Sequence, residues 1–170
     1  MEEEIILVNK KDGEIGREEK LKAHKLGLLH RCFSILVFNS KGGLMLQKRA
    51  AGKYHSAGLW SNTCCGHPRP GEDVITAGQR RLQEEMGFKC ELKEVMGFIY
   101  KAELDHGLTE NEFDHVLIGK YDGGPVLNPE EAEDWRFVSL ERLEKEINSQ
   151  PEKFTAWLKI ILLKLRSAKA

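Results

Sequence analysis

The amino-acid sequence predicts an α/β (α+β) protein in which a mixed β-sheet is sandwiched between helices. Segments with strand-like and helix-like patterns alternate along the chain. A polar turn at residues 39–43 separates two apolar runs, which is a β-hairpin signal and predicts antiparallel neighbours in the sheet. Near the end of the chain, apolar residues recur at helical spacing, as in a helix that packs one face on a sheet.

The first half of the chain is predicted to be rich in strands. Residues 5–8 form a short apolar strand, and residues 17–24 form a short, highly charged helix. Strands over residues 33–38 and 44–48 flank the polar turn. Residues 50–72 are rich in Gly, His and polar residues, and an irregular segment of that length in a compact domain is usually functional.

The second half begins with a helix over residues 72–86, which Gly87 ends. Ser139 is a typical N-cap, so another helix follows over residues 140–147. Strands are predicted over residues 95–104, 113–121 and 135–138, with a second irregular segment at 105–111. The last helix covers residues 154–165, and its apolar stripe consists of Phe154, Trp157, Leu158, Ile161, Leu162 and Leu165.

Length and charge restrict the function. We expect one domain over residues 1–170, with a core at about residues 27–165 and an N-terminal extension at residues 1–26. The 26 basic and 27 acidic residues leave a net charge of −1, which excludes a basic domain that binds nucleic acid through bulk charge. No run approaches the roughly 20 apolar residues of a transmembrane helix, so we expect no membrane span.

The four cysteines indicate a reducing compartment. Cys32, Cys64, Cys65 and Cys90 are too few for a disulfide scaffold, and no two of them have C-x-x-C spacing. The start of the chain is acidic and lacks the apolar region of a signal peptide. We therefore expect a cytoplasmic protein.

The densest motif joins the first irregular segment to the helix that follows it. Gly66 is followed at fixed spacing by Glu72, Arg80, Arg81, Leu82, Glu84, Glu85, Gly87 and Phe88. This resembles the Nudix box, G-x5-E-x7-R-E-U-x-E-E-x-G-U, over its full length, where U is a bulky apolar residue. The resemblance implies a Nudix-type fold, with a mixed sheet between helices.

One position departs from the box, because Arg81 occupies the place of a Glu. In Nudix hydrolases the clustered carboxylates hold divalent cations against a diphosphate and activate water. Arg81 removes one metal ligand and supplies a cation that can hold a diphosphate oxygen, which favours diphosphate binding without hydrolysis. The alternative is a solvated helix with i,i+4 ion pairs, Arg80 with Glu84 and Arg81 with Glu85.

A second group combines histidines and carboxylates: His24, His30, His67, Glu110 and Glu112. Residues i and i+2 of an extended segment point to one side, so Glu110 and Glu112 share a side, as do Cys65 and His67. A site rich in nitrogen and oxygen suits an octahedral divalent ion such as Mn²⁺, Fe²⁺ or Mg²⁺. A surface or packed position is the better interpretation for the other histidines, His55, His106 and His115.

Several motifs in order make the resemblance more specific. They are His24, Leu29-His30-Arg31, residues 33–39, residues 61–68, Glu110-Asn111-Glu112 and residues 154–157. Over about residues 20–165 the chain is similar to type I isopentenyl-diphosphate delta-isomerases, which also carry an Arg at the position of Arg81. The resemblance implies isomerisation of isopentenyl diphosphate to dimethylallyl diphosphate in isoprenoid biosynthesis, by protonation and deprotonation.

The family's two proton-transfer groups lie on opposite faces of the substrate and correspond by motif position to Cys65 and Glu112. Glu112 would also contact the metal, and a metal-held carboxylic acid protonates an alkene more readily than a free one. Tyr100 would hydrogen-bond that carboxylate. Cys64 is the better candidate for a buried apolar residue, because neighbours in an extended segment face opposite sides.

The resemblance also implies the diphosphate-binding cations, which are Lys20, Arg49, Lys53 and Arg81. Lys20 lies in a charged run, where a solvated face is the default interpretation. Mg²⁺ would bridge the diphosphate and Glu85, and a second divalent metal (Mn²⁺, Mg²⁺ or similar) would occupy the His/Glu site. A carbocation is stabilised by aromatic faces, and the candidates are Trp157 and Trp60, although relatives do not all have an aromatic residue at position 60.

Three functions stay open from the sequence. The first is the isomerase, with a small-molecule prenyl diphosphate as its partner and either a monomer or a homodimer as its assembly. The second is a Nudix hydrolase of a nucleoside or prenyl diphosphate, against which Arg81 counts. The third is a non-enzymatic domain that binds a metal or a diphosphate, against which the presence of both Cys65 and Glu112 counts.

Overall fold

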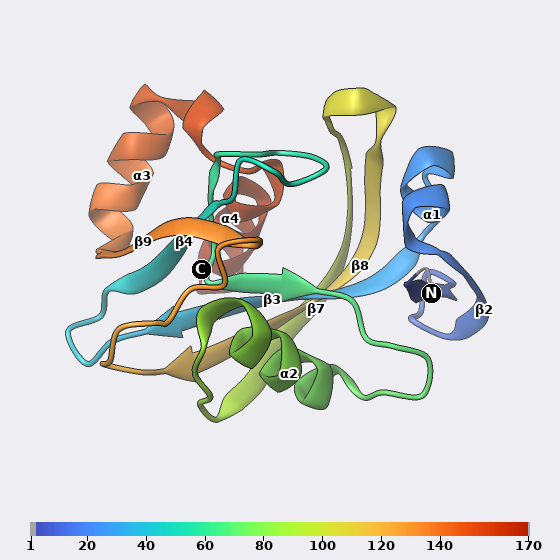
Figure 1. The fold of residues 1–170 in the computed structure, drawn as a ribbon, viewed down its shortest axis with the longest axis horizontal. Helices are drawn as coiled ribbons and strands as arrows, with labels where there is room; N and C mark the ends of the chain where they lie inside the picture. The colour runs from blue at the N-terminus through green and yellow to red at the C-terminus, as the bar shows by residue number, and fades with distance from the viewer. Residues whose placement is uncertain (1–2, 170) are drawn as a thin grey trace.

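The computed structural model describes residues 3–169, whose nine strands form one sheet (Figure 1). Its long strands are β3 (His30–Phe38), β7 (Leu92–Glu103) and β8 (Thr109–Lys120). β3 and β8 pair in parallel, whereas β7 and β8 form an antiparallel pair. The mixed sheet predicted from the sequence is therefore confirmed.

Three shorter strands share the other edge of β3. β1 (Glu4–Val8) pairs with the start of β3, β6 (Cys64–Gly66) with its middle, and β4 (Leu44–Arg49) with its end. All three run antiparallel to β3. The irregular segment predicted at residues 50–72 thus enters the sheet through β6, beside the middle of a buried strand.

The remaining strands extend the sheet outward. β2 (Glu14–Glu19) pairs with β1, and both β5 (Trp60–Ser61) and β9 (Ala132–Val138) pair with β4. The sequence does not predict β5 or β6 because strands of two or three residues have no readable periodicity. β2 is not predicted because its residues are mostly charged or small, a composition that is typical of a helix or a loop.

Helices cover both faces of the sheet (Figure 1). α2 (Val74–Met86) packs on one face, over an apolar core to which β3 contributes Phe33, Ile35 and Val37. α3 (Leu140–Ser149) and α4 (Ala156–Lys169) cover the other face, where β3 contributes Leu36. Successive residues of a strand point to opposite faces, so one strand supplies both cores.

The predicted helix ends are close to the observed ones. α2 begins at Val74 rather than residue 72, because Asp73 is the N-cap and accepts a hydrogen bond from the Thr76 N–H. Gly87 ends α2 in the left-handed region, as predicted, with φ of 71°. Ser139 caps α3 as predicted. The last helix begins two residues later than predicted, after a short 3-10 turn at Pro151–Lys153.

The helix predicted at residues 17–24 is wrong at its start. Ile5 and Ile6 of β1 lie opposite Glu18 and Arg17, so these charged residues form an edge strand. Helix α1 (Lys20–Leu26) begins only after Glu19, whose carboxylate accepts two backbone N–H bonds as its N-cap. The shift matters for the site, because it places α1 beside the start of β3.

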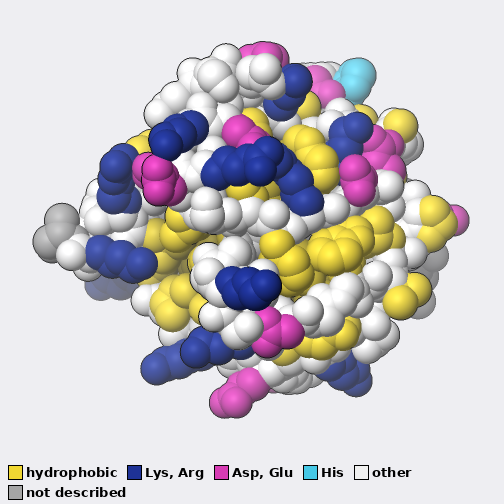
Figure 2. Space-filling model, turned by 90° about the vertical axis from the view of Figure 1, so that its left-hand side faces the viewer, with side chains coloured by type: hydrophobic (Ala, Val, Ile, Leu, Met, Phe, Trp, Pro, Cys, Tyr) yellow, Lys and Arg dark blue, Asp and Glu magenta, His cyan; other side chains and the backbone are white. Residues whose placement is uncertain are grey.

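The surface at the left of Figure 1, which carries α3, has hydrophobic side chains between basic and acidic ones (Figure 2). The most exposed large hydrophobic residues of the described chain are Val126, Ile15 and Leu163, which belong to separate segments. Single exposed apolar residues are ordinary in folded proteins. These residues do not decide between a monomer and a homodimer, so the assembly stays a prediction.

Within residues 3–169, no helix has the length and apolarity needed to span a bilayer.

Candidate active site

β6 carries two of the predicted site residues into the middle of the sheet. Cys65 lies opposite Ser34 of β3, and Cys64 lies opposite Ile35. Cys64 is fully buried in the core beneath α2, whereas Cys65 and His67 line a pocket on the other face. The predicted position of Cys64 in the apolar core is confirmed, and its cause is the alternation of strand side chains.

Gly66 allows α2 to approach β6 closely. A Cβ atom at this position would lie 2.8 Å from Phe33 Cζ and 3.0 Å from Arg81 Cγ, closer than packed side chains tolerate. Glycine therefore brings the motif helix, with Arg81 and Glu85, to the pocket that Cys65 lines.

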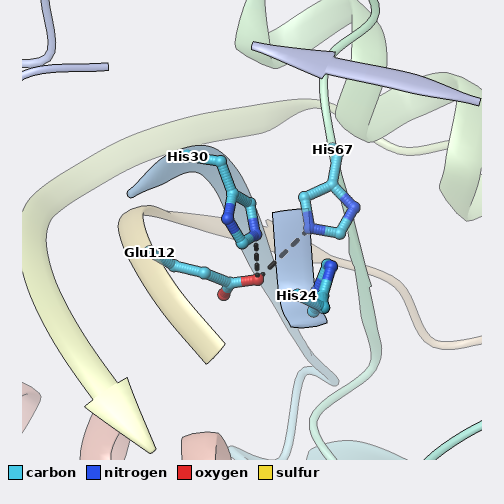
Figure 3. Close-up of side chains that lie close together, drawn as sticks. All are labelled: His24, His30, His67 and Glu112. Atoms are coloured by element: carbon cyan, nitrogen blue, oxygen red, sulfur yellow. Dashed lines mark hydrogen bonds and ion pairs between the residues drawn. The ribbon is translucent and has the colours of Figure 1, made fainter. Parts of the chain in front are cut away.

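The five residues predicted for the His/Glu site come together beside this pocket, which His67, Glu110 and Glu112 also line. Nε2 of His30 and Nε2 of His67 each lie 3.2 Å from Glu112 Oε1, and His24 belongs to the same cluster (Figure 3). Oε2 of Glu110 lies 3.3 Å from Nε2 of His24. All five side chains are buried. Because α1, β3, β8 and the loop after β6 each contribute, the cluster exists only in the folded chain.

Backbone hydrogen bonds fix two of the imidazoles. Nδ1 of His24 lies 2.7 Å from the Lys20 carbonyl oxygen, and Nδ1 of His30 lies 2.8 Å from that of Leu28, so each Nδ1 carries a proton that it donates. Burial lowers the pKa of His24, and it lowers the pKa of His67 to about 3, which keeps both rings neutral. The Nε2 lone pair of a neutral His24 therefore points at a carboxylate oxygen.

Such an arrangement suits a bound cation. Among the described residues, Nε2 of His24 and Oε2 of Glu110 are buried and have no hydrogen-bond partner. Burial and the neighbouring Glu112 carboxylate raise the pKa of Glu110 well above its ordinary value. A positive ion between these atoms would satisfy the lone pairs and offset the repulsion. The buried His/Glu cluster can therefore hold a metal ion with nitrogen and oxygen ligands.

The two oxygens of Glu112 have different partners. Oε1 faces the histidines, whereas Oε2 accepts hydrogen bonds from the Tyr100 hydroxyl at 2.6 Å and the Cys32 thiol at 2.8 Å. Tyr100 lies directly opposite Glu112 in the register of β7 and β8. The structure thus places Tyr100 where the resemblance implies, and it adds Cys32, which the sequence does not predict as a site residue.

Polar side chains also surround Cys65. The Asn62 amide nitrogen lies 3.2 Å from Sγ and donates to it, and Ser34 Oγ lies 3.6 Å away. The Ser34 hydroxyl donates to Asp114 Oδ2 at 2.8 Å. Burial raises the pKa of the Cys65 thiol, with a further contribution from the Asp114 charge. Burial also raises the pKa of Asp114 itself to about 7.

The four predicted diphosphate-binding cations line the same pocket, together with Glu85. Lys20 comes from α1, Arg49 from the end of β4, Lys53 from the loop after β4 and Arg81 from α2. Arg81 forms an ion pair with Glu85 at 2.5 Å. Nε of Arg49 is buried and has no hydrogen-bond partner within the described part of the chain. These four residues, which we call the cationic rim, suit an anionic ligand.

Trp157 forms an aromatic wall of the pocket. Its indole N–H donates to Ser61 Oγ at 2.9 Å, and the Arg49 guanidinium lies 5.1 Å from its ring centroid. Trp60, the other aromatic candidate, does not line the pocket, so this prediction is wrong. Trp60 precedes Ser61 in β5 and points the opposite way, where Arg136 lies over its ring at 4.8 Å.

His55 is the histidine that sequence reasoning missed. It is packed, as predicted, but it lines the pocket, with Nε2 3.6 Å from Glu110 Oε1 and its ring edge-on to Trp157. The sequence feature that could have indicated a site role for His55 is its position in the irregular segment at residues 50–72, two residues after Lys53. His115 is packed and His106 is exposed, so those two interpretations are confirmed.

Comparisons with known proteins agree with this geometry. The family model of the NUDIX domain matches residues 28–158. Isopentenyl-diphosphate Delta-isomerase 1 of Aromatoleum aromaticum is 56% identical over 158 residues, which cover 93% of this chain and 89% of that protein. Isopentenyl-diphosphate Delta-isomerase of Serratia proteamaculans is 52% identical, with 95% and 90% of the two chains covered.

Solved structures show the same fold at low sequence identity. A protein of Deinococcus radiodurans has a TM-score of 0.80 at 20% identity, covering 95% of this chain and 98% of that chain. A MutT protein from Methanosarcina mazei has a TM-score of 0.67 at 21% identity, covering 83% and 95%. The fold is thus the mixed α/β Nudix fold, and the curated relatives show that the chain belongs to the isopentenyl-diphosphate Delta-isomerase family.

Proposed function

We propose that the protein interconverts isopentenyl diphosphate and dimethylallyl diphosphate. The observation that carries the proposal is one pocket lined by Cys65, Glu112 and the cationic rim, next to the His/Glu cluster. The isomerisation adds a proton to the terminal methylene carbon and removes one from the allylic methylene carbon, with a tertiary cation between the two steps. Two proton-transfer groups in one buried pocket match that requirement.

Each group has a distinct role in this proposal. Glu112 donates a proton to the alkene, and Cys65 accepts one from the opposite side of the substrate. The Asn62 N–H beside Sγ favours the thiolate form of Cys65, which is the form that accepts this proton. Trp157 offers its ring to the positive charge and excludes water from it. One turnover in this direction therefore removes a proton from Glu112 and adds one to Cys65, and proton exchange with solvent restores both groups before the next turnover.

Two divalent ions fit the remaining residues. One ion, Mn²⁺, Mg²⁺ or similar, would be held by His24, His30, His67, Glu110 and Glu112. When bound, it makes a coordinated carboxylic acid more acidic. Mg²⁺ would accompany the diphosphate at Glu85, and the diphosphate oxygens would be held by the cationic rim.

The alternative function is a Nudix hydrolase of a diphosphate substrate. Arg81 counts against hydrolysis, because it stands where the box has a carboxylate and so removes one metal ligand. We also propose that the protein acts in the cytoplasm, since its four cysteines are free and Cys65 can transfer a proton only while it is reduced.

A ³¹P and ¹H NMR time course of the protein with isopentenyl diphosphate and Mg²⁺ tests this proposal. The expected result is dimethylallyl diphosphate, with total diphosphate unchanged. Release of inorganic phosphate or diphosphate without the isomer would favour the hydrolase and contradict the proposal. Unchanged substrate would contradict both functions.

A further inference from the structure

Cys32 is a buried thiol for which the proposed mechanism has no use. It lies on β3 and is 3% exposed, and it lines the same pocket as Cys65. Its Sγ lies 2.8 Å from Glu112 Oε2. A carboxylate oxygen offers only lone pairs, so the Cys32 S–H is the donor in this contact.

The contact follows from the arrangement of three strands. Glu112 stands on β8, with Tyr100 on the antiparallel strand β7 and Cys32 on the parallel strand β3. Tyr100 and Cys32 therefore reach Oε2 from the two strands that flank β8. Two donors match the two lone pairs of a carboxylate oxygen, so Oε2 is fully occupied.

The other oxygen of Glu112 is left for the metal cluster. Oε1 faces Nε2 of His30 and Nε2 of His67, as Figure 3 shows. We infer that Cys32 is a positioning residue, which together with Tyr100 restricts Glu112 to a one-oxygen contact with a metal ion in the His/Glu cluster. Oε2 is thereby kept away from the metal ion, and the effect of this restriction on the isomerisation rate rests on the proposed function.

The shortest polar contact of the Cys32 thiol is the one to Glu112 Oε2. Asp114 lies opposite Cys32 in the β3–β8 register, and its Oδ2 accepts the Ser34 hydroxyl at 2.8 Å. An apolar side chain would fill this buried position without the cost of burying a polar group. The thiol is therefore explained by the bond that it donates to Glu112.

Variants of Cys32 separate the hydrogen bond from the packing. Cys32→Ala removes the donor, whereas Cys32→Ser keeps an O–H in nearly the same place. Cys90→Ala is the matched control, because Cys90 packs against the core beneath α2, on the opposite face. Each protein is stripped of metal and loaded with Co²⁺, whose visible absorption reports coordination number without any turnover.

The expected result is a weaker Co²⁺ band in Cys32→Ala, because Glu112 gains a second oxygen contact and the coordination number rises. Cys32→Ser and Cys90→Ala keep the spectrum of the unaltered protein. An unchanged spectrum in Cys32→Ala would overturn the inference, as would an equal change in Cys32→Ser. Failure of the unaltered protein to bind Co²⁺ would overturn it too.

Isomerase kinetics give a second readout. We expect kcat to fall about tenfold in Cys32→Ala, the effect of losing one hydrogen bond to a charged group, with KM within about twofold. Cys32→Ser should recover most of kcat. A change in KM alone, or equal losses in both variants, would contradict the positioning role. If the unaltered protein forms no isomer, the proposed function fails, while the Co²⁺ comparison still decides the inference about Glu112.

Discussion

The central strands β3 and β8 present two contrasting faces. Toward α2 they contribute Phe33, Ile35 and Leu117 to an apolar core. On the opposite face of the same strands, Ser34 and Glu112 are equally buried but polar. Burying apolar side chains stabilises a fold, whereas burying carboxyl groups costs free energy unless each has a partner. The face toward α2 is therefore an apolar core, whereas the opposite face combines a second apolar core with the buried polar groups of the site.

The adjacent cysteines bring this comparison down to single residues. Cys64 belongs to the apolar core, and Cys65 lines the pocket. We expect Cys65→Ala to lose isomerase activity by a factor of about a hundred or more, the usual contribution of a general acid or base. Its free energy of unfolding should change little. Steady-state kinetics and urea unfolding measure the two quantities.

Cys64→Ala is the matched control for that variant. It should lose about 1 kcal/mol of unfolding free energy through the lost packing, while activity stays within about twofold. Glu112→Gln should resemble Cys65→Ala in activity. Equal activities in Cys64→Ala and Cys65→Ala would contradict the claim that, of these two cysteines, only Cys65 takes part in the reaction.

Metal binding should have the next largest effect. The cluster brings lone pairs together, so the metal-free protein should be less stable than the loaded one. Mn²⁺ at a hundred times its Kd should add about 2.7 kcal/mol to the free energy of unfolding. His30→Ala should lose most of this gain, and His106→Ala, at an exposed position, should keep it. Thermal unfolding with and without Mn²⁺ measures the gain, and an equal gain in both variants would refute the site.

Asp114→Asn tests the energetic cost of the polar face. Burial raises the pKa of Asp114 from an ordinary value of 3.8 to about 7. A raised carboxyl pKa means that stability is complete below the unfolded-state pKa and is lost as pH rises through the folded-state pKa. The neutral variant should therefore be more stable by about 1 to 3 kcal/mol at about pH 8, with no gain near pH 4.

Urea unfolding of both proteins at the two pH values checks this expectation. The difference between the proteins should grow steadily as pH rises between these limits. A gain independent of pH would mean that the ionised carboxylate is not the source of the cost.

The smallest effect is expected at the edge of the pocket. Lys20 is partly exposed and pairs with Glu3, and we expect Lys20→Met to raise KM about fivefold with little change in kcat. Lys22→Met is the control, because Lys22 is more exposed and pairs with Glu18 instead. Kinetics over a range of substrate concentrations separate the two constants. The same KM in both variants would contradict the proposed contact between Lys20 and the diphosphate.

Sequence motifs predict the parts of the site that the family pattern marks. The motif positions of His24, His67 and Glu112 predict that they share one cluster, and the structure brings them together although they come from distant segments. Cys32 and His55 could not be found in this way. Their contacts depend on the parallel register of β3 with β8 and on the path of an irregular loop, and neither leaves a local pattern.

The errors have a similar physical origin. Residues 17–19 carry charges that suit an exposed helix, yet pairing with β1 makes them an edge strand. Trp60 has the right chemistry for the pocket, but strand alternation turns it to the other side of β5. Long elements with clear caps, such as α2, were predicted to within two residues, because their signals are local.

Deuterium incorporation tests the central claim most directly, which is that Glu112 and Cys65 add and remove protons on one substrate. Isopentenyl diphosphate is incubated with the protein and Mg²⁺ in heavy water, and the product is analysed by ¹H and ²H NMR. We predict dimethylallyl diphosphate with deuterium in the methyl group derived from the terminal methylene carbon, and almost none of this product with Cys65→Ala. Product without deuterium, or undiminished product from Cys65→Ala, would contradict the account.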